Sequence, residues 1–169
     1  MASATDPDFA DRVRESFARQ NVMHLIRATL PVVEPGRTEI HLPHWEGVEQ
    51  QHGFVHGGVV GTIADSAAGY AAMTVVPASA SVLTVEYKMN LMAPADGEKL
   101  IARGEVVRPG RTLIVTRAEV FAVKAGRDRG EMRFSLAGLA VPQHRPEFRL
   151  RQDVASRARH RHHPAAPGV

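Results

Sequence analysis

Apolar and polar positions follow a helical period in two segments of this chain and a strand-like pattern in six others. The first helix is expected to begin after Asp6 or Asp8, either of which could cap it, and to run to about Gln20. Its apolar side chains recur every four residues on one face; they are Phe9, Val13 and Phe17. Two strands are expected next, over His24–Val33 and Arg37–Pro43, with a tight turn at residues 34–37 and an irregular connection over 44–57.

The segment from Gly57 to about Val76 consists of small and apolar residues, and it predicts one long helix that is buried on most sides. Its glycines lower helix propensity, so we expect a sheet to approach the helix backbone closely there. Pro77 is expected to end it. Four further strands are predicted over Ser81–Met92, Glu98–Val107, Thr112–Val123 and Gly130–Val141. Their connections are short and rich in Gly and Pro, which predicts an antiparallel meander and an α+β fold.

Asp65 is the only formally charged residue between Glu49 and Glu86, and it lies two turns inside the long helix. Aspartate is a poor residue for a helix interior, and burying its charge without a partner is costly. Asp65 is therefore a candidate catalytic carboxylate. The alternative is that it lies on an exposed stripe or meets a basic residue from elsewhere in the chain.

The sequence His56-Gly57-Gly58 stands at the start of the same helix. Both glycines are expected to present unshielded backbone N–H groups, which can bind an anion or a developing oxyanion. Gly57 and Asp65 are eight residues apart, which is about 12 Å along a helix axis. If both are catalytic, each site takes one residue from each of two antiparallel helices, and the enzyme is at least a dimer.

Four segments of the chain resemble the PaaI-like, phenylacetate-type hotdog thioesterases. They are residues 50–65 (QQHGFVHGGVVGTIAD), residues 83–95 (LTVEYKMNLMAPA), Gly-Glu at 97–98 and RPGRTL at 108–113. The resemblance covers about residues 22–141. It implies a hotdog fold, in which an antiparallel sheet wraps around one long central helix, and a homodimer that usually assembles into a homotetramer. It also implies hydrolysis of acyl- or aryl-CoA thioesters to the free acid and CoA. No cofactor is implied, because coenzyme A is part of the substrate.

The resemblance also suggests roles for individual residues. The family's helix carboxylate falls on Asp65, as nucleophile or general base, and its oxyanion N–H falls on Gly57. A hydroxyl residue that helps to hold the attacking water falls on Thr84. The family often has an asparagine where this chain has Gln50, with Gln51 beside it, so the amide that polarises the thioester stays open. Gly58 and the strand turn that contacts coenzyme A complete the substrate-binding set; the turn residues are Arg108, Pro109, Gly110, Arg111, Thr112 and Leu113.

Two other functions stay open. A hydratase or dehydratase of acyl thioesters would use a histidine beside the carboxylate, for which His56 is the candidate. A non-catalytic regulator would bind acyl-CoA without turnover. A metal enzyme is not favoured, because His52 and His56 precede the helix and lack a third ligand. A serine hydrolase is not favoured either, because Ser66 has no Gly-x-Ser-x-Gly elbow around it.

Composition and charge narrow the classes of protein to which the chain could belong. The 169 residues suit one domain with a polar N-terminal helical segment (residues 1–21), the thioesterase domain (22–141) and a basic, disordered tail (142–169). The tail holds six arginines against two acids and accounts for the net positive charge, so the pI near 9.8 does not indicate nucleic-acid binding. The chain has no cysteine, which excludes disulfides and thiolate nucleophiles. No signal sequence or membrane span is evident, and we expect a cytoplasmic protein.

Overall fold

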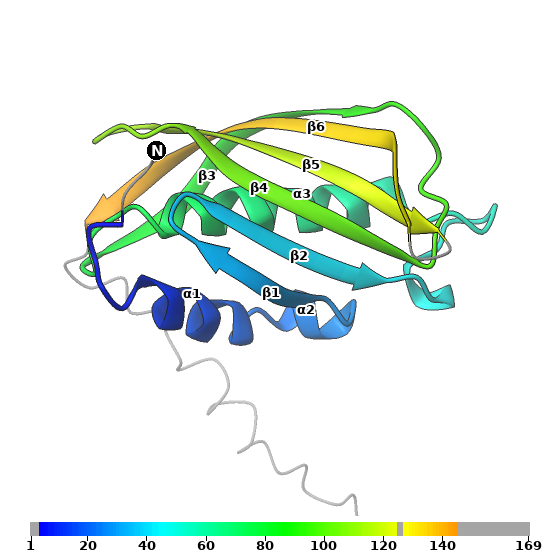
Figure 1. Ribbon diagram of the computed structural model, residues 1–169, viewed down its shortest axis with the longest axis horizontal. Helices are drawn as coiled ribbons and strands as arrows, with labels where there is room; N and C mark the ends of the chain where they lie inside the picture. The colour runs from blue at the N-terminus through cyan, green and yellow to red at the C-terminus, as the bar shows by residue number, and fades with distance from the viewer. Residues whose placement is uncertain (1–3, 125–126, 145–169) are drawn as a thin grey trace, which may run out of the picture.

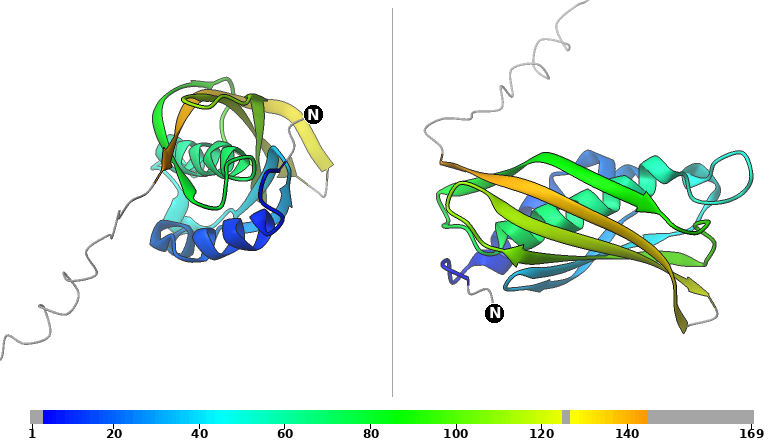
Figure 2. Two further views of the ribbon diagram at one scale, coloured as in Figure 1. Left: turned by 90° about the vertical axis from the view of Figure 1, so that its left-hand side faces the viewer. Right: turned by 90° about the horizontal axis from the view of Figure 1, so that it is seen from above.

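One long helix lies inside a curved antiparallel sheet in the computed structural model of the protein, which describes residues 4–124 and 127–144 (Figure 1). Viewed end-on, the sheet curves around this helix, and the N-terminal helix lies outside it (Figure 2). The elements in chain order are α1 (Phe9–Ala18), α2 (Asn21–Leu25), β1 (Thr29–Glu34), β2 (Arg37–Pro43), the 3-10 turn η1 (Glu46–Val48), α3 (Gly57–Met73), β3 (Ala80–Leu91), β4 (Lys99–Arg108), β5 (Ile114–Lys124) and β6 (Arg127–His144). The predicted α+β class and central helix are confirmed.

The described strands form a six-stranded sheet in the order β1-β2-β4-β5-β6-β3. All pairings are antiparallel as predicted, but the predicted meander is wrong for β3, which pairs with β6 and not with β4. The chain between β3 and β4 makes no hairpin. It passes the start of α3, where the Val55 N–H donates to the Ala95 carbonyl at 3.2 Å, and it then joins β5 through a Glu98 N–H bond to the Val123 carbonyl. Strand β6 runs to His144, past the predicted end at Val141, and the rest of the predicted basic tail lies outside the described residues.

The prediction of a strand over residues 24–33 is wrong in its first half. The short helix α2 ends at Leu25, and β1 begins only at Thr29. Met23 and Ile26 are buried three residues apart, a helical spacing that the strand interpretation overlooked. Arg27 follows with a φ of 61°, in the left-handed region, and its guanidinium lies 3.9 Å from the centre of the Trp45 ring. This residue turns the chain into β1.

Helix α1 begins and ends close to the predicted limits, but the predicted side-chain cap is absent. Asp8 occupies the N-cap position without a capping hydrogen bond. The Asp6 carboxylate accepts instead from the Asp8 N–H, at 3.0 Å, and from Arg12 Nε, at 2.8 Å. On the predicted apolar face Val13 is fully buried, and the Phe17 ring meets the Tyr70 ring of α3 edge-on. Helix α1 is therefore fixed to α3 by an aromatic contact.

The sheet approaches α3 most closely at Gly104 of β4. A Cβ atom there would lie 2.2 Å from the Ala67 carbonyl oxygen, which also accepts a 2.7 Å hydrogen bond from Thr38 Oγ1 of β2. The predicted close approach thus exists, but the glycine that permits it is on the strand. The helix glycine Gly69 has no atom within 4 Å of an added Cβ.

Helix α3 ends at Met73, before the predicted limit at Val76. Thr74 follows as the C-cap residue, and its hydroxyl donates a 2.7 Å hydrogen bond to the Ala71 carbonyl in the last turn of the helix. The same hydroxyl accepts from the Gly36 N–H of the β1–β2 turn at 2.7 Å. The helix thus ends on these local bonds, and Pro77 has no N–H to donate to the Met73 carbonyl, which accepts from Arg12 instead.

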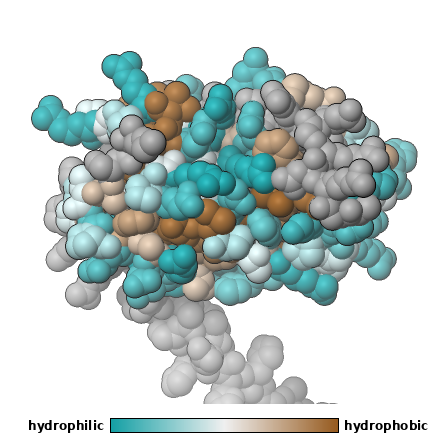
Figure 3. All heavy atoms as spheres, in the orientation of Figure 1, coloured by the Kyte–Doolittle hydropathy of each residue, from teal (hydrophilic) through white to brown (hydrophobic). Residues whose placement is uncertain are grey.

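The face of the sheet turned away from α3 carries charged side chains among apolar ones. The largely buried Glu39 accepts from Arg37 and Arg103, and Arg103 lies 4.8 Å from the centre of the Phe121 ring. Polar and apolar side chains are intermixed over the face of the molecule seen in Figure 3.

Among the described residues no helix is long and apolar enough to cross a membrane.

Candidate active site

The outward stripe of α3 is lined by small and polar residues, and Asp65 lies in its middle. Most of the helix is buried, but this stripe is partly exposed; its residues are Gly58, Thr62, Asp65, Ser66 and Gly69. In the single protomer Asp65 therefore lies on a partly exposed stripe. The charged carboxylate is half-buried and has polar neighbours from other elements.

Strand β3 runs antiparallel to α3 along this stripe. Leu91 lies nearest Gly57, Met89 and Tyr87 lie nearest Gly61, and the Thr84 hydroxyl donates to Asp65 Oδ1 at 2.8 Å. The register of β3 against β6 shifts between Thr84 and Glu86. A bulge of this kind re-aims side chains, and here it lies beside the hydroxyl that contacts Asp65. The structure thus brings together the two residues that the sequence paired.

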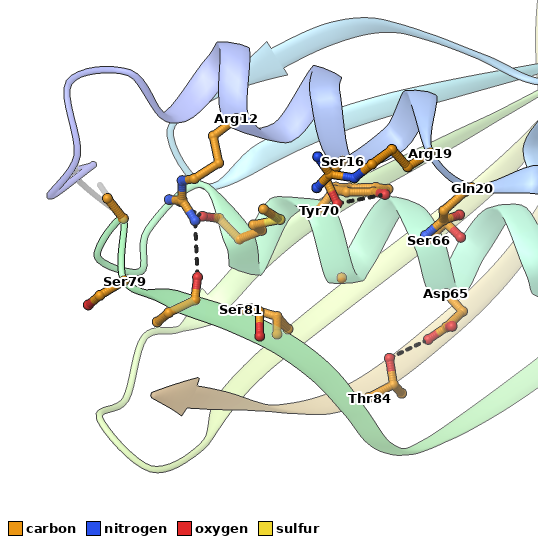
Figure 4. Close-up of a pocket in the computed structure, with 15 residues that line it drawn as sticks. Arg12, Ser16, Arg19, Gln20, Asp65, Ser66, Tyr70, Ser79, Ser81 and Thr84 are labelled. Atoms are coloured by element: carbon orange, nitrogen blue, oxygen red, sulfur yellow. Dashed lines mark hydrogen bonds between the residues drawn. The ribbon is translucent and has the colours of Figure 1, made fainter. Parts of the chain in front are cut away.

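Asp65 and Thr84 line a cavity of about 340 Å³ between α1, α3 and β3 (Figure 4). Sequence reasoning missed the contribution of α1 to this cavity. Three polar residues, two in α1 and one directly after it, recur at positions i, i+4 and i+7 beside the apolar face, and this periodicity could have identified them. The missed lining residues are Arg12, Ser16, Arg19, Gln20 and Tyr70.

Arg12 closes the end of the cavity farthest from Asp65. Its guanidinium donates to the Asp6 carboxylate and to the carbonyls of Ala80, Met73 and Val76, at distances of 2.8 to 3.2 Å. These bonds satisfy carbonyls at the end of α3 and fix α1 to the start of β3. Four of the five guanidinium N–H donors of Arg12 therefore hold the wall of the cavity.

Tyr70 and Ser16 face each other across the cavity wall, with their hydroxyl oxygens 3.4 Å apart. Burial raises the pKa of the Tyr70 phenol above its ordinary value, and the Ser16 hydroxyl and the Arg19 charge partly oppose that shift. Tyr70 thus remains a protonated phenol at neutral pH. The cavity keeps two hydroxyl groups and one arginine together on this wall (Figure 4).

The start of α3 is capped by His56, whose Nδ1 accepts from the Gly58 N–H at 2.9 Å. The prediction that both glycine N–H groups are unshielded is therefore wrong for Gly58. The Gly57 N–H donates to no other residue in the described part of the chain. Because Nδ1 is an acceptor, the neutral His56 ring carries its proton on Nε2.

The two glutamines before α3 differ in how they are held. Gln50 Oε1 accepts from the His52 N–H at 2.5 Å, which leaves the Gln50 side-chain NH₂ as a donor. The Gln50 N–H donates to the Phe54 carbonyl and closes a turn. Gln51 is exposed on that turn. Gln50 is thus the anchored amide. Among the described residues no three His, Asp or Glu side chains form a group that could hold a metal ion.

The turn over residues 108–113 lies elsewhere in the protomer, at the other end of α3. A second cavity of about 510 Å³ separates part of this turn from the segment that follows α3; it is lined by Val75, Val76, Pro77, Pro109, Gly110, Arg111 and Ile114. Residues 108–113 are exposed, and neither Arg108 nor Arg111 has an ion-pair partner in the described part of the chain. One protomer therefore does not bring this turn to the start of α3.

Comparison with known proteins identifies the family. The model of the thioesterase superfamily matches residues 52–127. The crystal structure of a thioesterase family protein from Silicibacter pomeroyi shares 42% sequence identity with this chain and superposes with a TM-score of 0.78, over 81% of this chain and 99% of that one. The chain belongs to the thioesterase superfamily. Its hotdog fold, expected from the sequence, is confirmed.

Two further proteins resemble this thioesterase-superfamily chain, one in fold and one in sequence. The PaaI protein of the Escherichia coli phenylacetic acid degradation operon superposes with a TM-score of 0.69 at 13% identity, over 80% of this chain and 94% of that one. A Saccharolobus solfataricus protein described as a candidate esterase is 34% identical over 87 residues, which are 52% of this chain. The chain spans 61% of that relative's length.

Proposed function

We propose that this protein hydrolyses acyl-CoA thioesters to the free acid and CoA, with Asp65 as the catalytic carboxylate of a site shared by two subunits. The observation that carries the proposal is the Asp65–Thr84 pair, which lies in the middle of α3 and lines a cavity. Thioesterase-superfamily membership agrees with hydrolysis. Superfamily membership alone does not identify the acyl group or the roles of single residues, which are part of this proposal.

The chemistry follows from the free oxygen of Asp65. Thr84 donates to Oδ1, and Oδ2 accepts no hydrogen bond from the described residues. Oδ2 can accept a proton from a water that Thr84 helps to hold, or it can attack the thioester carbonyl. Both routes develop a negative charge on the carbonyl oxygen, and they need a donor there.

The Gly57 N–H is the proposed donor to that oxygen. It is open in the described structure, it lies at the positive end of the α3 dipole, and the Gln50 NH₂ group stands nearby in the chain as a second donor. Within one subunit Gly57 and Asp65 are separated by about 12 Å along the helix axis, too far to act on one carbonyl. The proposal therefore pairs Asp65 with Gly57 of the partner subunit.

Strand β3 supplies a surface for that partner. It is a terminal strand of the described sheet, and it exposes a row of large apolar side chains: Leu83, Val85, Tyr87 and Leu91, each between 47% and 59% exposed. An unpaired apolar edge of 12 residues is a template for pairing with another chain. Antiparallel pairing of two β3 strands about a twofold axis sets the α3 helices antiparallel, because each β3 runs antiparallel to its own α3. The same assembly allows Arg108 and Arg111 to meet CoA phosphates, and further assembly into a tetramer is part of the proposal.

The test is product analysis with the purified protein. We expect release of free CoA thiol and the matching acid from a panel of aromatic, short, medium and long acyl-CoAs. An enoyl-CoA substrate separates hydrolysis from hydration, since a hydratase would yield the 3-hydroxyacyl-CoA with the thioester intact. Binding of acyl-CoA without any product would contradict the proposal.

A further inference from the structure

The cavity beside Asp65 has a polar wall that a simple alkyl acyl chain would not need. It extends from Asp65 along α3, past Ser66 and Gly69, to Tyr70 and Met73. Aliphatic acyl groups are held by apolar walls, and polar groups in such pockets fix the orientation of a polar substrate. The hydroxyls of Ser16 and Tyr70 and the Arg19 guanidinium gather on one side of it (Figure 4).

Of the two arginines that line the cavity, Arg19 is the one without an ion-pair partner among the described residues, while four of the five N–H donors of Arg12 are already bonded. Arg12 is bonded to Asp6 and to three backbone carbonyls. The Arg19 guanidinium forms no ion pair with any residue that the structure describes, and its charge acts on the Tyr70 phenol. A planar guanidinium with free donors matches a carboxylate in both charge and geometry.

We propose that Arg19, with the Tyr70 and Ser16 hydroxyls, selects acyl groups that end in a carboxylate. The inference rests on the proposed function, since it places the thioester carbonyl at Asp65. Tyr70 is five residues after Asp65, so the polar wall begins about 7.5 Å farther along the helix. A carbon–carbon bond of about 1.5 Å advances an extended chain by about 1.25 Å, so a dicarboxylic monothioester of roughly six or seven carbons spans that distance.

The charges along the cavity agree with a substrate whose thioester lies at Asp65 and whose carboxylate lies at Arg19. Asp65 repels a carboxylate at the thioester end, while Arg19 attracts one at the distal end, and Arg12 is neutralised by Asp6. The middle of the cavity is formed by Gly69, which has no side chain, and by the apolar Val82, where methylene groups fit. The substrate class is therefore an acyl-CoA with a short methylene chain and a terminal carboxylate.

The experiment compares pairs of substrates that differ only at the far end of the acyl chain. Adipyl-CoA is compared with hexanoyl-CoA, and glutaryl-CoA with pentanoyl-CoA, with protein-free buffer as the blank for spontaneous hydrolysis. We expect the wild-type protein to show the higher kcat/KM for the carboxylate member of at least one pair. Arg19→Gln should lower that value by about tenfold, mainly through KM, as expected for an ionic contact at a partly exposed site.

The controls use the same helix and the same charge. Arg14 is an exposed arginine of α1 that does not line the cavity, and Arg14→Gln should leave the preference unchanged. Arg19→Lys should restore part of it, and added KCl should reduce it. If the protein hydrolyses these CoA esters but favours the uncharged members, or keeps its preference in Arg19→Gln, the inference about Arg19 is wrong while hydrolysis stands. If no ester is hydrolysed faster than the blank, the proposed function itself fails.

Discussion

Asp65→Asn is expected to lower kcat/KM for acyl-CoA hydrolysis by about a thousandfold or more, because an amide can neither attack the carbonyl nor accept a proton from water. Asparagine has the same shape as aspartate, and its carbonyl oxygen can still accept the Thr84 hydrogen bond of 2.8 Å. The variant should therefore fold normally. Steady-state release of CoA and a thermal unfolding curve on the same preparation measure the two properties separately.

Two neighbouring substitutions show whether the loss belongs to the carboxylate. Thr84→Val keeps the shape of the side chain and removes its hydroxyl, and we expect roughly a tenfold loss, because Oδ1 then lacks the hydrogen bond that orients it. Ser66→Ala changes the residue next to Asp65 in the same cavity and should change kcat/KM by only a few-fold. Turnover by Asp65→Asn within tenfold of wild type would rule out the catalytic assignment.

Gly104→Ala is expected to destabilise the fold by about 3 kcal/mol, the upper range for overpacking a close contact. The added methyl carbon would lie 2.2 Å from the Ala67 oxygen and 2.6 Å from the Ala68 nitrogen. Both are backbone atoms of α3, so no side-chain rotation can relieve the overlap. The helix must move away from β4 and strain the Thr38 bond to Ala67. Urea unfolding at fixed protein concentration measures the loss as a lower midpoint.

The matched control is the helix glycine at position 69. An added Cβ there meets nothing within 4 Å, so Gly69→Ala gains helix propensity and should stabilise the protein by up to about 1 kcal/mol. Opposite signs at Gly104 and Gly69 would agree with the packing described above. Equal midpoints for the two variants would mean that β4 does not contact α3 as closely as the structure has it.

The sequence was most informative where one residue type is unusual in its surroundings. The isolated charge of Asp65 within an apolar helix indicated the site, and the resemblance then pointed to Thr84, which the structure places within hydrogen-bonding distance. The limits of β2 and the start of α3 were also predicted correctly, because Gly, Pro and alternating residues mark them clearly.

The errors arose where a distant part of the chain decides the structure. β3 pairs with β6, a contact between strands about 50 residues apart that the local turn signals between β3 and β4 do not encode. One error is local: the Gly58 N–H is taken by the ring of His56, two residues earlier, which could equally have faced solvent. Arg19 reaches the cavity only because Phe17 docks α1 on Tyr70, and nothing near Asp65 in the sequence indicates that contact.

Mixing two inactive variants measures directly whether the site is shared. Asp65→Asn removes the carboxylate, and Gly57→Pro removes the N–H at the first helical position, where proline is well tolerated. His56 is already extended, with a ψ of 134°, as a residue before proline prefers, and the lost N–H has no bonding partner among the described residues. Gly57→Ala adds a Cβ near Leu91 but keeps the N–H, so it should stay active and is the control for the added carbon.

Each variant alone should be inactive, while every mixed dimer should contain one site with an intact Asp65 and an intact Gly57 from different chains. After equal mixing and confirmed subunit exchange, half of the dimers are mixed, and activity should return to about one quarter of the wild-type value. No return of activity under those conditions would show that Asp65 and Gly57 do not act on one substrate from opposite subunits.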